Sequence, residues 1–70
     1  MIAIDSKFIE ALGYEVDTKE LFIKFHSGTT IYVYENVEQN EFNRFVIAPS
    51  SGKYFRENIF DKYDYYKLTR

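Results

Sequence analysis

The sequence predicts an α+β fold, in which a three-stranded antiparallel meander is followed by two C-terminal helices packed on the sheet. In the first half of the chain, apolar and polar residues alternate with the period of two that is typical of strands. After Asn36 the period changes to about 3.6 residues, which is typical of helices. A sheet must bury one face, and two helices can cover it. Seventy residues are expected to form a single domain, residues 1–70.

Three segments of the first half have the pattern of strands. The first is expected over residues 9–16, where Gly13 marks a bulge or a close approach. The second and third are expected over residues 21–26 and 29–34, both with apolar residues at alternate positions. Gly28 lies between them and can adopt positive φ, which predicts a tight hairpin turn.

The first helix is expected to begin after Asn36, whose side chain can cap it, with Gln39 three residues later as in a capping box. Pro49 disfavours helical backbone at Ala48, so the helix is expected to end there. The apolar residues at helical spacing between these limits are Phe42, Phe45 and Val46.

The second helix is expected to begin at a serine cap, either Ser50 or Ser51. Phe55 and Ile59 lie four residues apart and mark its buried side. Residues 63–68 alternate loosely, so they are expected to form a short strand or an ordered tail.

Charge and cysteine content exclude several classes of function. The chain has 9 basic and 11 acidic residues, and its net charge of -2 argues against a general DNA or RNA coater. It has no cysteine, which removes disulfides, thiolate zinc sites and cysteine nucleophiles. A secreted domain of this size usually needs disulfides, so a cytoplasmic location is expected. No signal peptide is recognised, and no apolar run approaches the roughly 20 residues that span a membrane.

No active site is predicted, so the protein is expected not to be an enzyme. His26 is the one histidine, and its neighbour Ser27 points to the opposite face of a strand. Such a pair cannot share a proton as a nucleophile and its base do. The carboxylates are spread singly along the chain, so neither a metal nor a cofactor is expected.

The segment from Ser50 to Arg56 carries the strongest signal for ligand binding. It combines hydroxyl groups, the first unpaired amides of a helix, a glycine that permits close approach, and two cations three residues apart. Such a segment can hold a phosphate, although serine is also simply a favoured helix cap. The candidate ligand-binding residues are Ser50, Ser51, Gly52, Lys53, Tyr54, Arg56, Tyr32 and Tyr34.

Aromatic residues are unusually frequent, since seven Tyr and seven Phe make up 20% of the chain. Tyr32 and Tyr34 lie on one face of the predicted strand, where they either stack on a base or pack against a covering helix. Residues 50–70 carry five basic and three acidic groups, interleaved with six aromatics from Tyr54 to Tyr66. That mixture suits a nucleotide or a single strand, but also an ordinary solvated helix and tail.

The order and spacing of these residues resemble the KTSC domain family, over nearly the whole chain. A proline that is common near the start of the family's first helix is here Glu38. The residues that carry the resemblance are residues 9–14 and 21–25, Ser27, Gly28, Tyr32, Val33, Tyr34, Ala48, Ser50, Gly52, Tyr54, Phe55, Ile59, Tyr63 and Tyr65.

The resemblance implies a small domain with no established enzymatic activity. Its members occur at the C-terminus of some lysyl-tRNA synthetases, which suggests RNA binding, and also as stand-alone proteins of bacteria and phages. The first hypothesis rests on the small size, the acidity and the anion-plus-aromatic pattern of the chain and not on the resemblance: it is an oligomer that holds or sequesters a small phosphate-bearing ligand of nucleotide type, as a phage sponge for immune signals would. An RNA-binding accessory domain and a protein-interaction module are the alternatives. The net charge favours the small ligand, because a polymer contacts several phosphates at once.

Overall fold

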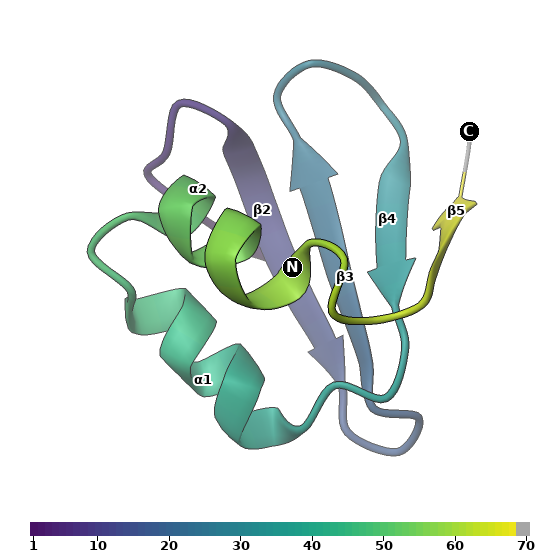
Figure 1. The fold of residues 1–70 in the computed structure, drawn as a ribbon. Coiled ribbons are helices and arrows are strands. Elements are labelled where there is room, and N and C mark those ends of the chain that lie inside the picture. Colours follow the sequence, from purple (N-terminus) through teal and green to yellow (C-terminus); the bar gives the residue numbers. More distant parts are fainter. Residues whose placement is uncertain (69–70) are drawn as a thin grey trace.

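A five-stranded antiparallel sheet organises the chain in the computed structural model, which describes residues 1–68 (Figure 1). The strands lie side by side in sequence order: β1 (Ile2–Ala3), β2 (Ile9–Glu15), β3 (Glu20–Phe25), β4 (Ile31–Tyr34) and β5 (Tyr65–Leu68). Between β4 and β5 come α1 (Gln39–Ile47), α2 (Ser51–Tyr54) and η1 (Phe55–Ile59), a π-helical turn that continues α2. Figure 1 shows the helices in front of one face of the sheet, and the other face is left uncovered.

The predicted three-stranded meander with two C-terminal helices is wrong. The sheet has five strands, and the helices lie between β4 and β5 instead of ending the chain. β1 is only two residues long, too short to show alternation, and it exists because Ile2 and Ala3 pair with Leu12 and Ala11 of β2. β5 is a strand because it pairs with β4. Its short sequence pattern by itself fits a strand and an ordered tail equally well.

The core lies between the helices and the inner face of β2, β3 and β4. The register places Ile23 of β3 opposite both Leu12 of β2 and Tyr32 of β4, so the three side chains lie on the same face. Full burial of an aliphatic or Phe side chain stabilises the fold by roughly 1.5–3 kcal/mol. The buried cluster consists of Ile9, Leu12, Leu21, Ile23, Tyr34, Val37, Phe45 and Ile59.

The structure confirms the predicted close approach at Gly13, but the positive φ predicted for Gly28 is wrong. The irregularity in β2 falls between Ile9 and Ala11, and Gly13 is a point of close approach, where a Cβ atom would lie 3.0 Å from Met1 Cγ. No glycine among residues 1–68 has positive φ, so the turn after β3 does not use that freedom of Gly28. The left-handed backbone occurs instead at Lys19, Asn36 and Asp61.

The first helix does not begin with the predicted asparagine cap. Asn36 has φ 59°, a left-handed conformation that asparagine tolerates better than most residues, and it turns the chain out of β4. That turn lets Val37 enter the core and donate its backbone N–H to Lys19 O at 2.9 Å. The N-cap residue is Glu38, whose side chain makes no cap hydrogen bond.

The helices are short and end where the backbone must change direction. Ala48 follows α1 with φ -62° and ψ 138°, the extended backbone preferred by the residue before a proline. α2 is capped by Ser50, whose Oγ accepts from Lys53 N at 3.3 Å. Within residues 1–68, no helix is long and apolar enough to span a membrane.

Candidate functional site

An apolar groove lies between the start of β2, the end of β3 and the helical segment α2–η1. Its volume is about 430 Å³. A smaller and more polar hollow of about 210 Å³ adjoins it, and Phe8, Gly52 and Arg56 line both. We call them the aromatic groove, lined by Phe8, Ile9, Phe25, Gly52, Phe55, Arg56 and Phe60, and the polar hollow, lined by residues 5–8, residues 49–53 and Arg56.

Phenylalanine rings form most of the wall of the aromatic groove. The Phe25 ring packs edge to face on the Phe55 ring, with the two centroids 5.4 Å apart. The centroid of the Phe60 ring lies 6.1 Å from that of Phe55. Phe8 closes the other side and is 66% exposed, so its ring is available to a ligand. A Cβ atom on Gly52 would lie 3.1 Å from Phe8 Cδ2, which means that the missing side chain of Gly52 makes room for the Phe8 ring.

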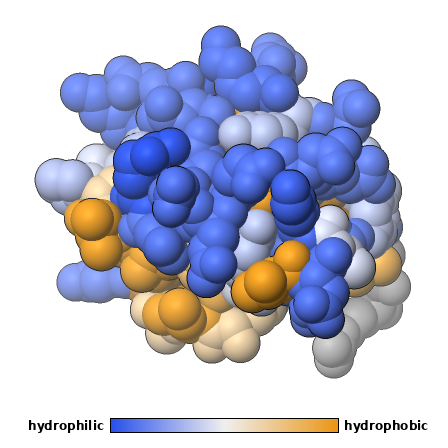
Figure 2. Space-filling view, turned by 90° about the horizontal axis from the view of Figure 1, so that it is seen from below, coloured by the Kyte–Doolittle hydropathy of each residue, from blue (hydrophilic) through white to orange (hydrophobic). Residues whose placement is uncertain are grey.

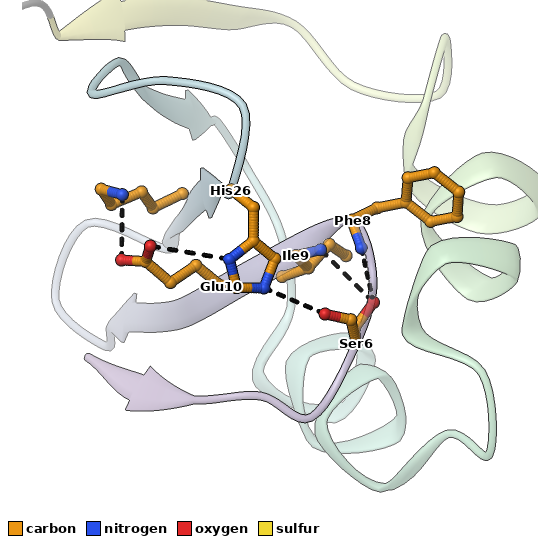
Figure 3. A network of polar contacts seen from close by, with 6 residues as sticks. Ser6, Phe8, Ile9, Glu10 and His26 are labelled. Atoms are coloured by element: carbon orange, nitrogen blue, oxygen red, sulfur yellow. Dashed lines mark hydrogen bonds and ion pairs between the residues drawn. The ribbon is translucent and has the colours of Figure 1, made fainter.

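A polar network holds residues 6–9 in the conformation that presents Phe8 (Figure 3). The Ser6 hydroxyl accepts hydrogen bonds from the backbone N–H groups of Phe8 at 3.2 Å and Ile9 at 3.3 Å. His26 Nε2 lies 3.0 Å from the carbonyl oxygen of Ser6, and the backbone N–H of His26 donates to Phe8 O at 3.0 Å. In Figure 3 the Phe8 ring points away from this network, towards the helices.

Glu10 extends the network along the sheet. Its carboxylate lies 2.9 Å from Lys24 Nζ and 3.7 Å from His26 Nδ1. The hydrogen bond from Lys24 lowers the pKa of Glu10 below its ordinary value. His26 is exposed and anchors the loop of residues 6–9, so its position supports a structural role.

The structure brings the predicted serine, glycine and cation residues together in the polar hollow. Lys53 and Arg56 are exposed, and Lys7 adds a third cation from the facing loop. Within residues 1–68, none of these three cations has an ion-pair partner, although the Asp5 carboxylate lines the same hollow.

The two serines are partly committed to the fold. The hydroxyl of Ser50 already accepts the cap hydrogen bond from Lys53 N, which occupies one of the helix amides predicted to be unpaired. Ser51 is only 7% exposed. The cations and the glycine therefore offer more to a ligand than the serine hydroxyls do.

None of the three predicted tyrosines lines the aromatic groove. Tyr34 is 3% exposed and packs its ring against Phe55, and burial raises its pKa to about 12. Tyr32 is half-buried and packs edge to face on Phe25, 5.4 Å between centroids. Tyr54 stacks on Phe45 and donates a hydrogen bond to the Glu41 carboxylate. The helical segment packs on Tyr34 through Phe55, while Phe25 and Tyr65 of the neighbouring strands pack on Tyr32, so both rings are in contact with the protein itself.

Glu41 joins α1 to the helical segment that follows it. Its side chain is 15% exposed, and it accepts hydrogen bonds from Tyr54 and, at 3.2 Å, from Tyr63. Burial away from solvent is the main cause that raises the pKa of Tyr54 and Tyr63, and the nearby Glu41 carboxylate is the second. These contacts give Tyr54 a structural role in holding the helices together.

Sequence reasoning missed the loop of residues 5–8, which supplies one wall of both hollows. Ser6, Lys7 and Phe8 place a hydroxyl, a cation and an aromatic ring next to one another, and that was the available signal. Helical spacing predicts Phe55 only as part of the buried side of the second helix, not as the wall of a groove. Within residues 1–68, no group of three or more His, Cys, Asp or Glu side chains is placed to hold a metal ion.

The fold and the groove together define a small antiparallel-sheet domain with helices on one face and a ligand-sized hollow at one end of the helical segment. The family model of the KTSC domain matches residues 5–63, so the chain belongs to the KTSC domain family. A crystal structure of a KTSC domain protein from Yersinia pestis is similar over 96% of this chain and 93% of that chain, with 28% sequence identity and a TM-score of 0.91. No curated protein matches the chain.

Proposed function

We propose that the protein is a non-enzymatic binding module for a small ligand of nucleotide type. The flat ring of the ligand lies in the aromatic groove, and its phosphate lies beside Lys7, Lys53 and Arg56. The observation that carries the proposal is that the two hollows adjoin: Phe8 and Arg56 line both, so one ligand can contact rings and cations together.

The size and the lining of the aromatic groove suit such a ligand. Its volume of about 430 Å³ falls in the usual range for small-molecule sites, roughly 300–1,000 Å³. Stacking of a base on an aromatic side chain contributes about 1–3 kcal/mol. Phe8 is the best placed ring for this contact, because it is the most exposed of the four phenylalanines.

The polar hollow supplies the charge that a phosphate needs. A charge-assisted hydrogen bond contributes about 1.5–3 kcal/mol, and a cation that has no carboxylate partner gives up little to make it. Two cations come from α2–η1 and one from the facing loop, so a phosphate would be held from two sides.

RNA binding is the second candidate, and the cations of the polar hollow also favour it. A polymer would contact several phosphate-binding residues, including some outside the hollow, whereas a small ligand would not. The net charge of -2 continues to favour the small ligand. Sequestration of the ligand by an oligomer, in the cytoplasm, is the role that we assign to this binding.

Thermal denaturation with a panel of nucleoside monophosphates, cyclic dinucleotides, inorganic phosphate and a short single-stranded RNA tests the proposal. A ligand at a hundredfold excess over its dissociation constant stabilises the fold by about 2.7 kcal/mol. In a domain of this size each kcal/mol raises the melting temperature by roughly 4–8 °C. A panel that leaves the melting temperature unchanged would overturn the nucleotide-type ligand.

Paired variants separate the two candidates. The double variant Lys53→Ala with Arg56→Ala should abolish the shift caused by a small ligand, while Lys62→Ala, the matched control, should leave it intact. RNA binding would instead fall steeply with salt, because several phosphates are contacted at once. Circular dichroism confirms that each variant is folded before its affinity is compared.

A further inference from the structure

β5 forms an unpaired edge of the sheet. All four residues of β5 are exposed, and no strand among residues 1–68 pairs with its outer side. The opposite edge, β1, is only two residues long. Free backbone N–H and C=O groups on an edge strand are a template for another strand, and such edges are protected by a very short strand, a lysine, a proline, a bulge or a covering segment. β5 has four residues and one lysine, Lys67, whose charge the pairing proposed below places against an aromatic ring. β5 contains no proline, and its register with β4 is regular.

The hydrogen-bond pattern shows which backbone groups of β5 face outward. Glu35 N donates to Asp64 O at 2.9 Å, so these two residues form a hydrogen-bonded pair at the end of the β4–β5 ladder. Such pairs alternate along antiparallel strands, so Tyr66 is bonded to Val33, while Tyr65 and Lys67 direct their N–H and C=O groups to the free edge.

We propose that β5 pairs antiparallel with β5 of a second copy of the chain, about a twofold axis that passes between the two Tyr66 residues. Tyr65 then lies opposite the partner's Lys67, and each of these two pairs exchanges both backbone hydrogen bonds. The pairing uses the outward-facing groups of Tyr65 and Lys67 and leaves the β4–β5 ladder untouched.

Two neighbouring registers fit less well. A shift that brings Lys67 opposite the partner's Lys67 places like charges directly across the pair, which is destabilising. A shift in the other direction brings Lys67 opposite the partner's Tyr63, which lies outside the strand, so fewer residues pair. Only the register with Tyr66 at the twofold axis pairs both outward-facing residues, Tyr65 and Lys67, with residues of the partner's β5.

The side chains of β5 favour the same register. Lys67 Nζ lies 5.6 Å from the centroid of the Tyr32 ring, and Tyr65 stacks on Tyr34 at 5.2 Å. Tyr65 is 51% exposed, so its ring can receive the partner's Lys67 from the far side and extend the cation–π contact across the axis.

The other face of β5 continues the uncovered side of the sheet. Tyr66 donates to Glu20 Oε2 at 2.5 Å across β4, and Val33 between them is fully buried. Hydrophobic residues gather along the lower side of Figure 2, the side away from the helices. A twofold contact is self-complementary and closes on itself, so it gives a dimer and not a fibre.

Sedimentation velocity and a proline variant test the pairing. The wild-type chain should sediment as a dimer, with twice the 8.4 kDa of one chain. Lys67→Pro removes an outward N–H that β4 does not use, so it should give a folded monomer, whereas Lys67→Ala keeps that N–H and should still dimerise. A wild-type chain that stays monomeric up to high micromolar concentration overturns the proposal, and so does a Lys67→Pro variant that still dimerises.

Single cysteines test the register, because the natural chain has none. Tyr66 and the partner's Tyr66 form a non-hydrogen-bonded pair, with Cα atoms about 4.5 Å apart, which is within the range that a disulfide spans. Tyr66→Cys should therefore form a disulfide dimer on mild oxidation much faster than Ile47→Cys, a control that is 79% exposed on α1. Equal rates for these two variants, or faster cross-linking of Lys67→Cys, overturn the register.

Discussion

Replacement of Gly52 by alanine tests whether the aromatic groove is adaptable. An alanine in a helix is more stable than glycine by roughly 0.5–1 kcal/mol, and Gly52 lies in α2 without positive φ. The new Cβ would lie 3.1 Å from Phe8 Cδ2, so the ring must move by a few tenths of an ångström. Because Phe8 is largely exposed, we expect it to move at small cost and the net change to be a gain of up to about 1 kcal/mol.

Gly28→Ala is the matched control for this substitution. Nothing lies within 4 Å of a Cβ at that position, so the variant reports the loss of unfolded-chain entropy alone, a gain of about 0.4–1 kcal/mol. Urea denaturation measures the free energy of unfolding of both variants. The difference between their two gains is the cost of moving the Phe8 ring. Gly52→Ala should also weaken ligand binding, and Gly28→Ala should not. Destabilisation of Gly52→Ala by more than about 1 kcal/mol would refute the reasoning, because Phe8 would then be rigidly held.

Three further predictions concern the core and two titrating groups. Phe45→Ala should lower the free energy of unfolding by about 3–5 kcal/mol in urea denaturation, since Phe45 is fully buried; a loss below about 1 kcal/mol would contradict its place in the core. The lowered pKa of Glu10 means that its stabilising effect is present above its unfolded pKa and is lost as the pH falls through the folded pKa. Glu10→Gln should therefore flatten the acid side of the stability curve, and an unchanged curve would rule out this contribution. Tyr34 should appear in a spectrophotometric titration as a tyrosine with a pKa of about 12, absent from Tyr34→Phe. Because the folded state favours the neutral form of Tyr34, this group contributes to the free energy of unfolding. The contribution is complete below the unfolded pKa of 10.0 and is lost as the pH rises through about 12.

The candidate site was predictable where its residues are neighbours in sequence. Lys53 and Arg56 lie on one exposed side of the helical segment, because their three-residue spacing is a local property of a helix. The facing wall, which includes Lys7 and Phe8, comes from more than forty residues earlier in the chain. Only the pairing of β2 with β3, together with the polar network of Ser6 and His26, brings that loop to the helix.

For Tyr32 and Tyr34 as well, the sequence predicts which face of the strand they share, but only the folded structure shows what covers that face. Alternation correctly places Tyr32 and Tyr34 on one face of β4, opposite Ile23 and Leu21 of β3. It leaves open whether a ligand or a protein segment covers that face. The structure assigns the face to the protein, because the ring of Phe55 packs against Tyr34 and excludes a base from it.

The sequence by itself determined the positions of the three central strands, the change to helical periodicity and the membership of the KTSC domain family. Each depends on patterns that neighbouring residues carry, since alternation and helical spacing act over a few residues. Only the tertiary structure decided that β1 and β5 are strands, that the helices precede β5, and that phenylalanines line the groove. A short edge strand and a groove wall exist only where distant segments meet, because their hydrogen bonds and contacts come from residues far along the chain.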